Sequence, residues 1–112
     1  MKKIEAIIRK SKFDQVRDAL LQVEVNFFSY WDVTGVGNEK KGHVYRGVSY
    51  STTDIQRRYI SIVVSDAFVD RTIEAILKSA YTGNVGDGKI VVSEVLEAYR
   101  IRTREKGQES LN

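Results

Sequence analysis

The apolar residues of this chain recur in an order that is used twice: a strand, a helix and a strand, followed by the same three elements. In the first half, residues 4–8 are an apolar stretch with charged neighbours, residues 11–23 carry apolar side chains at helical spacing, and residues 27–33 are aromatic and β-branched. The corresponding stretches of the second half are 59–64, 65–80 and 89–95. Two such units predict an α+β fold, a ferredoxin-like double β-α-β sandwich with both helices on one face of the sheet.

Polar residues mark where the two helices are expected to begin. Ser11 stands before the first helical pattern, and Asp14 follows three residues later, so Ser11 is the expected N-cap. Ser65 or Asp66 is the expected cap of the second helix, which should end near Ala80.

Length and composition limit the class of protein. A chain of 112 residues is long enough for one two-layer core, so we expect a single domain over residues 1–112. Cysteine is absent, which excludes a disulfide framework and a thiolate metal site and is compatible with a reducing compartment. We find no signal peptide and no apolar run of membrane-spanning length, so we expect a cytoplasmic protein without direct membrane insertion.

The sheet face away from the helices is also expected to carry apolar side chains. They are Ile7, Tyr59, Val63, Val91 and Val95. Because a small protein seldom leaves such a patch open to water, the pattern predicts a homo-oligomer.

A glycine-rich segment, TGNVGDGKI at residues 82–90, joins the second helix to the last strand. Glycines let backbone amides approach an anion, and Lys89 adds a positive charge, so the segment favours a phosphate. It is not a P-loop, because Ile90 replaces the required Ser or Thr and the helix precedes the loop. A plain helix-to-strand turn, with Gly83 as the C-cap, is the alternative. The formal charge of +3 suits a small anion better than a nucleic acid.

The second unusual segment, residues 35–58, lies between the two halves. It is rich in glycine, polar and cationic residues and has no sustained periodicity. A structureless connection of this length inside a small domain is usually functional or disordered. We expect a long mobile loop that either folds over an anionic ligand or inserts into a partner.

These features together resemble the PII nitrogen-regulatory signalling proteins. The resemblance covers nearly the whole chain and is most specific at TGNVGDGKI (82–90) and RIRT (100–103), with further matches at residues 1–9, 35–37, 45–50 and 62–64. It implies a homotrimer that binds ATP or ADP in three clefts between subunits. The implied nucleotide-binding residues are Ser29, Gly35, Gly37, Asn38, Val63, Gly86, Asp87, Gly88, Lys89, Arg100 and Arg102, the two arginines reaching the phosphates from a neighbouring subunit.

The resemblance also assigns a role to residues 35–58, which correspond to the family's mobile T-loop. This loop implies docking on a partner such as an ammonium transporter or an enzyme of nitrogen metabolism, and Tyr50 matches a tyrosine that some members have uridylylated. Mg²⁺ and 2-oxoglutarate are further implied ligands, near Glu39 and Arg57. Glu39 departs from the family's glutamine, and its carboxylate suits Mg²⁺ but would repel a dianion.

Three other classes of protein fit parts of the sequence. An enzyme would need a positioned base or nucleophile, and the chain offers one histidine, His43, within the loop. RNA-recognition modules share the β-α-β repeat, but Val48 stands where their motif needs an aromatic residue. A trimer of the same fold without nucleotide sensing would not require the glycine loop and the paired arginines. We therefore expect a regulatory protein and no enzymatic activity.

Overall fold

The computed structural model describes residues 1–38, 44–45, 48–49 and 52–111. Glu39, His43 and Tyr50 lie outside the described residues. The strands are β1 (Lys2–Arg9), β2 (Ser29–Asn38), β3 (Val44–Tyr45), β4 (Val48–Ser49), β5 (Thr52–Val64) and β6 (Lys89–Glu94). The helices are α1 (Phe13–Gln22) and α2 (Val69–Ala80), with short 3₁₀ turns η1 (Lys10–Lys12), η2 (Asp66–Phe68) and η3 (Gly107–Ser110).

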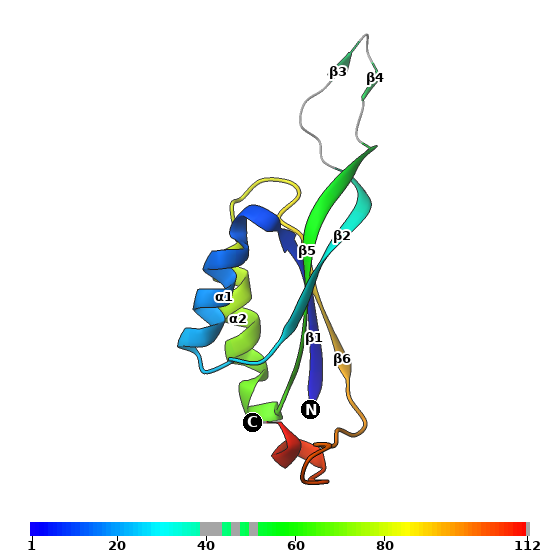
Figure 1. The fold of residues 1–112 in the computed structure, drawn as a ribbon. Helices are drawn as coiled ribbons and strands as arrows, with labels where there is room; N and C mark the ends of the chain where they lie inside the picture. Colours follow the sequence, from blue (N-terminus) through cyan, green and yellow to red (C-terminus); the bar gives the residue numbers. More distant parts are fainter. Residues whose placement is uncertain (39–43, 46–47, 50–51, 112) are drawn as a thin grey trace.

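The main sheet has four strands in the order β2-β5-β1-β6, and every neighbouring pair is antiparallel. Both helices lie on one face of this sheet (Figure 1). The predicted double β-α-β fold is therefore confirmed. A separate two-stranded sheet pairs β3 with β4.

The core lies between the helices and the sheet. Alternate residues of β1 and β5 point into it, and one face of each helix meets them; the most buried side chains are Ile4, Ile8, Val16, Leu20, Ile60, Ile62, Val64 and Ile76. Burial of each such side chain contributes about 1.5–3 kcal/mol relative to exposure. Thr72 is a buried polar residue of this core, and its hydroxyl donates to the Phe68 carbonyl at 2.5 Å. The core thus has the period-two and helical patterns expected from the sequence.

The predicted helix caps are wrong. A 3₁₀ turn precedes each helix, so α1 starts at Phe13 and α2 at Val69, and neither start has a side-chain capping hydrogen bond. Ser11 lies inside η1. Ser65 precedes η2 and offers its carbonyl to the Phe68 amide at 2.9 Å, whereas the Asp66 carboxylate accepts from the Met1 amino group at 2.6 Å.

The segment 35–58 is more regular than its composition indicates. β2 and β5 pair continuously from Ser29↔Ser61 to Asn38↔Thr52, so both ends of the expected loop are strands. Gly35 and Gly37 interrupt the apolar–polar alternation by which a strand is recognised in the sequence. Gly37 also lies so close to Ile55 that an added Cβ would be 3.2 Å from the Ile55 Cδ1 atom. The two strands leave the body of the molecule as a twisted ribbon (Figure 1).

The sheet face away from the helices is partly apolar, as expected. Ile7, Tyr59 and Val91 share it by register, and Trp31 stacks on Tyr59 with 4.6 Å between ring centroids. Val91 is 51% exposed and Trp31 47% exposed. We call this surface the open face.

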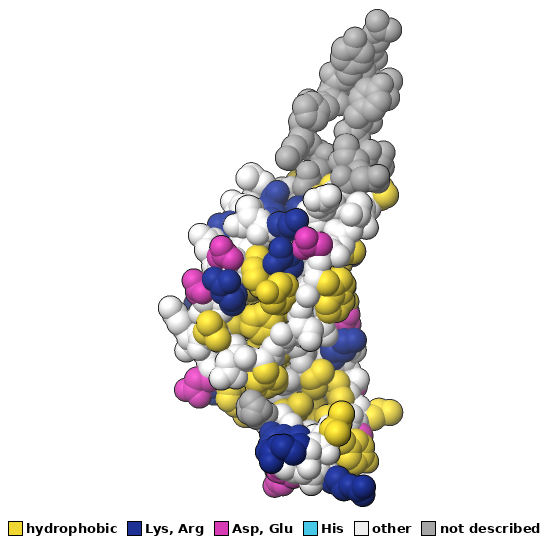
Figure 2. All heavy atoms as spheres, viewed as in Figure 1, with side chains coloured by type: hydrophobic (Ala, Val, Ile, Leu, Met, Phe, Trp, Pro, Cys, Tyr) yellow, Lys and Arg dark blue, Asp and Glu magenta, His cyan; other side chains and the backbone are white. Residues whose placement is uncertain are grey.

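The segment after β6 carries further exposed apolar side chains. Leu96 and Ile101 are each 95% exposed, and Tyr99 forms an isolated bridge with Lys106. In Figure 2 apolar side chains lie beside Lys and Arg at this lower end of the molecule. Such exposure within one chain is typical of a surface that another chain covers.

Candidate anion-binding site

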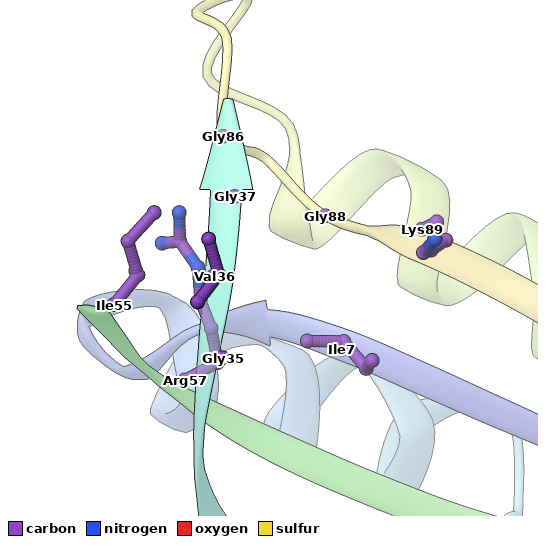
Figure 3. Close-up of a pocket in the computed structure, with 9 residues that line it drawn as sticks. All are labelled: Ile7, Gly35, Val36, Gly37, Ile55, Arg57, Gly86, Gly88 and Lys89. Carbon is purple, nitrogen blue, oxygen red and sulfur yellow. The ribbon is translucent and has the colours of Figure 1, made fainter. Parts of the chain in front are cut away.

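A cavity of about 420 Å³ lies where the β2–β5 ribbon leaves the sheet. Four segments build it (Figure 3): β1, the end of β2, the middle of β5, and the glycine loop with the start of β6. Its lining residues are Ile7, Gly35, Val36, Gly37, Ile55, Arg57, Gly86, Gly88 and Lys89. The fold therefore brings the glycine loop and the base of the 35–58 segment to one site.

The chemistry of this lining suits an anion with an apolar part. Arg57 and Lys89 are its charged side chains, and no carboxylate is among the described lining residues. Four glycines expose backbone to the cavity, while Ile7, Val36 and Ile55 supply apolar surface. Guanidinium, ammonium and glycine amides are the groups that hold phosphate in proteins.

The glycine loop requires its glycines. Gly83, Gly86 and Gly88 have φ angles of 89°, 104° and 99°, which residues with a side chain rarely adopt. A Cβ on Gly88 would lie 1.7 Å from the Ile7 carbonyl oxygen, so this position packs directly on β1. Gly83 is not the C-cap of α2, because the helix ends at Ala80 and Tyr81 follows in extended conformation.

Asp87 organises the loop from within. Its Oδ2 atom accepts hydrogen bonds from the backbone amides of Thr82 at 2.8 Å and Gly83 at 2.9 Å. Its Oδ1 atom accepts from the Thr82 hydroxyl and from Arg9 Nε, the latter at 3.2 Å. These bonds, above all those from Thr82, hold the pKa of the Asp87 carboxyl well below its usual range.

Six of the residues predicted from the sequence meet at this cavity: Gly35, Gly37, Arg57, Gly86, Gly88 and Lys89. Asn38 is next to Gly37 and ends β2, paired with Thr52. Asp87 lies in the same loop but is not among the residues that line the cavity.

Four other predicted residues, Ser29, Val63, Arg100 and Arg102, are not brought to this cavity. β6 starts at Lys89, opposite Ile7, and ends at Glu94, opposite Lys2, a span of about 16 Å, and both arginines follow that end. Val63 pairs with Lys3 near the same end, and Ser29 precedes Gly35 by six residues of strand, or about 20 Å. Within one chain these residues therefore lie apart from the cavity.

The local partners of the two arginines differ. Arg100 lies 3.5 Å from Glu105 Oε1 and donates to the Ser110 carbonyl at 3.4 Å, which fixes the turn after Tyr99. Arg102 is exposed in that turn. Arg100 is thus half-buried and engaged within its own segment, whereas Arg102, next to exposed Ile101, is accessible.

Sequence reasoning missed several contributors. The sequence pattern places Ile7 only on the open face and predicts no role for Val36 or Ile55, because the meeting of Val36 and Ile55 depends on the β2–β5 register. Arg9 and Thr82 also went unnoticed as supports of the loop. The alternation of β1 could have placed Arg9 on the face of Ile7, but its bond to Asp87 spans 78 residues.

Metal ligands are scarce near the cavity. Within the part of the chain that the structure describes, no three His, Cys, Asp or Glu side chains cluster so as to hold a metal ion. Glu39, the proposed magnesium ligand, lies outside that part. In the same described part, no helix is long and apolar enough to cross a membrane.

Fold and cavity define a small α+β protein in which one double β-α-β unit carries both a cavity suited to an anion and a projecting ribbon. A family model described as nitrogen regulatory protein P-II matches residues 1–105. A nitrogen regulatory protein P-II of Azospirillum brasilense is 44% identical over 113 residues, covering 99% of this chain and 100% of that one. The same protein of Haemophilus influenzae is 42% identical over the same coverage.

The chain belongs to the nitrogen regulatory protein P-II family. It is a PII signalling protein of nitrogen regulation, and such proteins are signal transducers without enzymatic activity. The family predicted from the sequence is thus confirmed, and the RNA-binding and enzyme alternatives are set aside.

Proposed function

We propose that this PII protein is a homotrimer that binds ATP or ADP in the clefts between its subunits and reports the bound nucleotide to partner proteins through residues 35–58. The observation that carries the proposal is the division of the predicted site residues between two ends of the sheet. Gly35, Lys89 and their neighbours line the cavity at one end, whereas Arg100 and Arg102 lie at the other. A second subunit whose far end meets this cavity would complete the cation set.

The chemistry of both groups supports a nucleotide polyphosphate. The cavity offers Arg57, Lys89 and glycine backbone, and the far end offers two guanidinium groups that can each bind phosphate oxygens in a fork. Ser29, Val63 and Asn38 are proposed to contact the nucleoside or the phosphates in the assembled cleft. The open face and exposed Leu96 and Ile101 supply apolar surface that the trimer would bury.

The connection between ligand and partner runs through the β2–β5 ribbon. Gly35, Val36 and Gly37 line the cavity and belong to β2, while Ile55 and Arg57 line it from β5. A ligand that contacts these strands favours some arrangements of the segment they carry, and a partner that binds one arrangement alters nucleotide affinity in return. We propose an ammonium transporter or an enzyme of nitrogen metabolism as the partner, met in the cytoplasm, with Tyr50 as a docking or uridylylation residue.

A second ligand is proposed for the same region. Arg57 lines the cavity and offers a guanidinium to a dicarboxylate such as 2-oxoglutarate. Mg²⁺ is proposed to be held by the nucleotide phosphates and Glu39. The negative charge of Glu39 would weaken the binding of the dicarboxylate. We therefore propose that the dicarboxylate binds less tightly than the nucleotide.

Calorimetry tests the proposal directly. ATP, ADP and AMP are titrated into the purified protein, each with and without Mg²⁺ and 2-oxoglutarate, and light scattering gives the mass. We expect a trimer that binds ATP and ADP at one site per chain and binds AMP more weakly. A monomer, or the absence of heat with every adenylate, would contradict it.

A further inference from the structure

The loop that carries Gly86, Gly88 and Lys89 is fixed by side chains that do not line the cavity. The Asp87 carboxylate uses both oxygen atoms inside the loop, accepting from the Thr82 amide, the Gly83 amide and the Thr82 hydroxyl. It also accepts from Arg9 of β1, whose side chain is partly buried. The same Arg9 donates through a terminal nitrogen to the Val85 carbonyl at 2.9 Å.

The Asp87 side chain lies away from the cavity that its neighbours Gly86 and Gly88 line. Gly86 lines the 420 Å³ cavity, Gly88 and Lys89 line both that cavity and a smaller pocket of about 120 Å³ beside Tyr81 and α2, and Asp87 lines the smaller pocket but not the larger one. A carboxylate turned toward a polyphosphate would repel it. With the Asp87 charge turned away and paired with Arg9, the charged groups lining the cavity are Arg57 and Lys89.

We infer that Asp87, Thr82 and Arg9 are positioning residues that hold the glycine loop in its anion-accepting shape, and that the Asp87 carboxylate does not contact the nucleotide. This inference rests on the proposed nucleotide function and revises the role that the family resemblance gives to Asp87. We call the three residues the loop brace. They tie the loop to β1 at Arg9, close to where Gly88 packs on the Ile7 carbonyl, so the loop cannot shift along the sheet.

The brace also explains the residue types. Thr82 supplies an amide and a hydroxyl to Asp87, and the same hydroxyl oxygen accepts the Asn84 amide at 3.1 Å. Arg9 supplies two nitrogens with separate directions, which lysine cannot do. Serine is therefore expected to replace Thr82, while valine, of the same shape, should not.

The test compares Thr82→Val, Thr82→Ser, Asp87→Asn, Arg9→Lys and the double variant Thr82→Val with Asp87→Asn. Asp18→Asn is the matched control, because Asp18 is an exposed carboxylate that pairs with Arg17 on α1. Two readouts are needed: amide hydrogen exchange over residues 82–88 in the nucleotide-free protein, and the dissociation constant for ATP. Thr82 is exposed, so its replacement leaves the core intact.

We expect Thr82→Val and Asp87→Asn each to speed hydrogen exchange of the Gly83 amide and to raise the ATP dissociation constant about tenfold. Arg9→Lys should do the same to a smaller extent, and Thr82→Ser should retain wild-type values. The double variant should bind ATP no more weakly than the weaker-binding single variant, because both changes break the same hydrogen-bond network. Asp18→Asn should change neither readout.

The opposite pattern would overturn the inference. If Thr82→Val left exchange and ATP affinity at wild-type values while Asp87→Asn weakened ATP, Asp87 would be a ligand contact. If the wild-type protein bound no adenylate, the proposed function would fail, and exchange in the nucleotide-free protein would still decide the brace: unchanged Gly83 protection in Thr82→Val rejects it, and faster exchange supports it.

Discussion

The two ends of the sheet present different surfaces to a ligand. At the ribbon end, strands and a glycine loop enclose a cavity whose parts are fixed by close packing and hydrogen bonds, as at Gly88 against Ile7. At the opposite end, Leu96, Ile101 and Arg102 lie exposed on the segment after β6 and point no side chain into an enclosed cavity among the described residues. The first end therefore suits a bound ligand, whereas the second offers exposed side chains that we propose a neighbouring subunit contacts. The contrast is the reason for proposing that the functional unit is larger than one chain.

The largest expected effect comes from Gly88→Ala at the ribbon end. The added Cβ would meet the Ile7 carbonyl oxygen at 1.7 Å and would force a side chain onto a positive φ. We expect a loss of roughly 3 kcal/mol or more in the free energy of unfolding, together with the loss of nucleotide binding. Urea unfolding and ATP titration measure the two effects.

Gly35→Ala is the matched control for that variant. A Cβ on Gly35 would meet nothing within 4 Å, so its unfolding free energy should stay within about 0.5 kcal/mol of wild type. If the two alanine variants were equally stable, the close packing of the glycine loop on β1 would not constrain this end of the molecule.

Lys89→Ala should have the next largest effect, and on binding alone. Lys89 is exposed and lines the cavity, so its loss removes a phosphate partner without disturbing the core. We expect the ATP dissociation constant to rise roughly tenfold to hundredfold. Mass measurement should still give a trimer; unchanged ATP affinity would remove the cavity from the proposed site.

The smallest expected effect concerns pH. The pKa of Asp87 is lowered in the folded protein, so its contribution to stability is present above the unfolded value near 3.8 and is lost as pH falls below it. The difference in unfolding free energy between wild type and Asp87→Asn should therefore be constant from pH 7 to about pH 5 and shrink below about pH 4. Because the carboxyl of folded Asp87 stays ionised well below pH 3.8, the decline should be gradual, and a difference that did not decrease at all between about pH 5 and about pH 2 would show that Asp87 acts by some means other than its charge.

Much of the fold follows from local patterns in the sequence. The alternation of residues 4–8 and the helical spacing of Val16 and Leu20 gave the order of elements, because a strand or helix face repeats within a few residues. The helix starts were wrong because 3₁₀ turns took the place of side-chain caps. The extent of β2 and β5 was missed because Gly35 and Gly37 interrupt the strand pattern, and pairing with a distant strand compensates for them.

The candidate site likewise has parts that the sequence predicts and parts that it does not. Lys89 and its glycines could be assigned from a short motif, since the chemistry of phosphate binding is carried by neighbouring residues. The direction of the Asp87 side chain could not, because it depends on Arg9, 78 residues away. Membership of the family was predictable from motifs spread over nearly the whole chain, and the match over residues 1–105 confirms it.

Mixing two defective subunits tests most directly whether the two ends meet across a subunit boundary. Lys89→Ala damages the ribbon end and Arg102→Ala the opposite end, so each homotrimer should bind ATP weakly. If the cleft takes one end from each of two chains, unfolding and refolding the variants together in equal amounts should restore about one quarter of the wild-type high-affinity sites. Restoration of none, with mixed trimers present, would contradict a site shared between subunits.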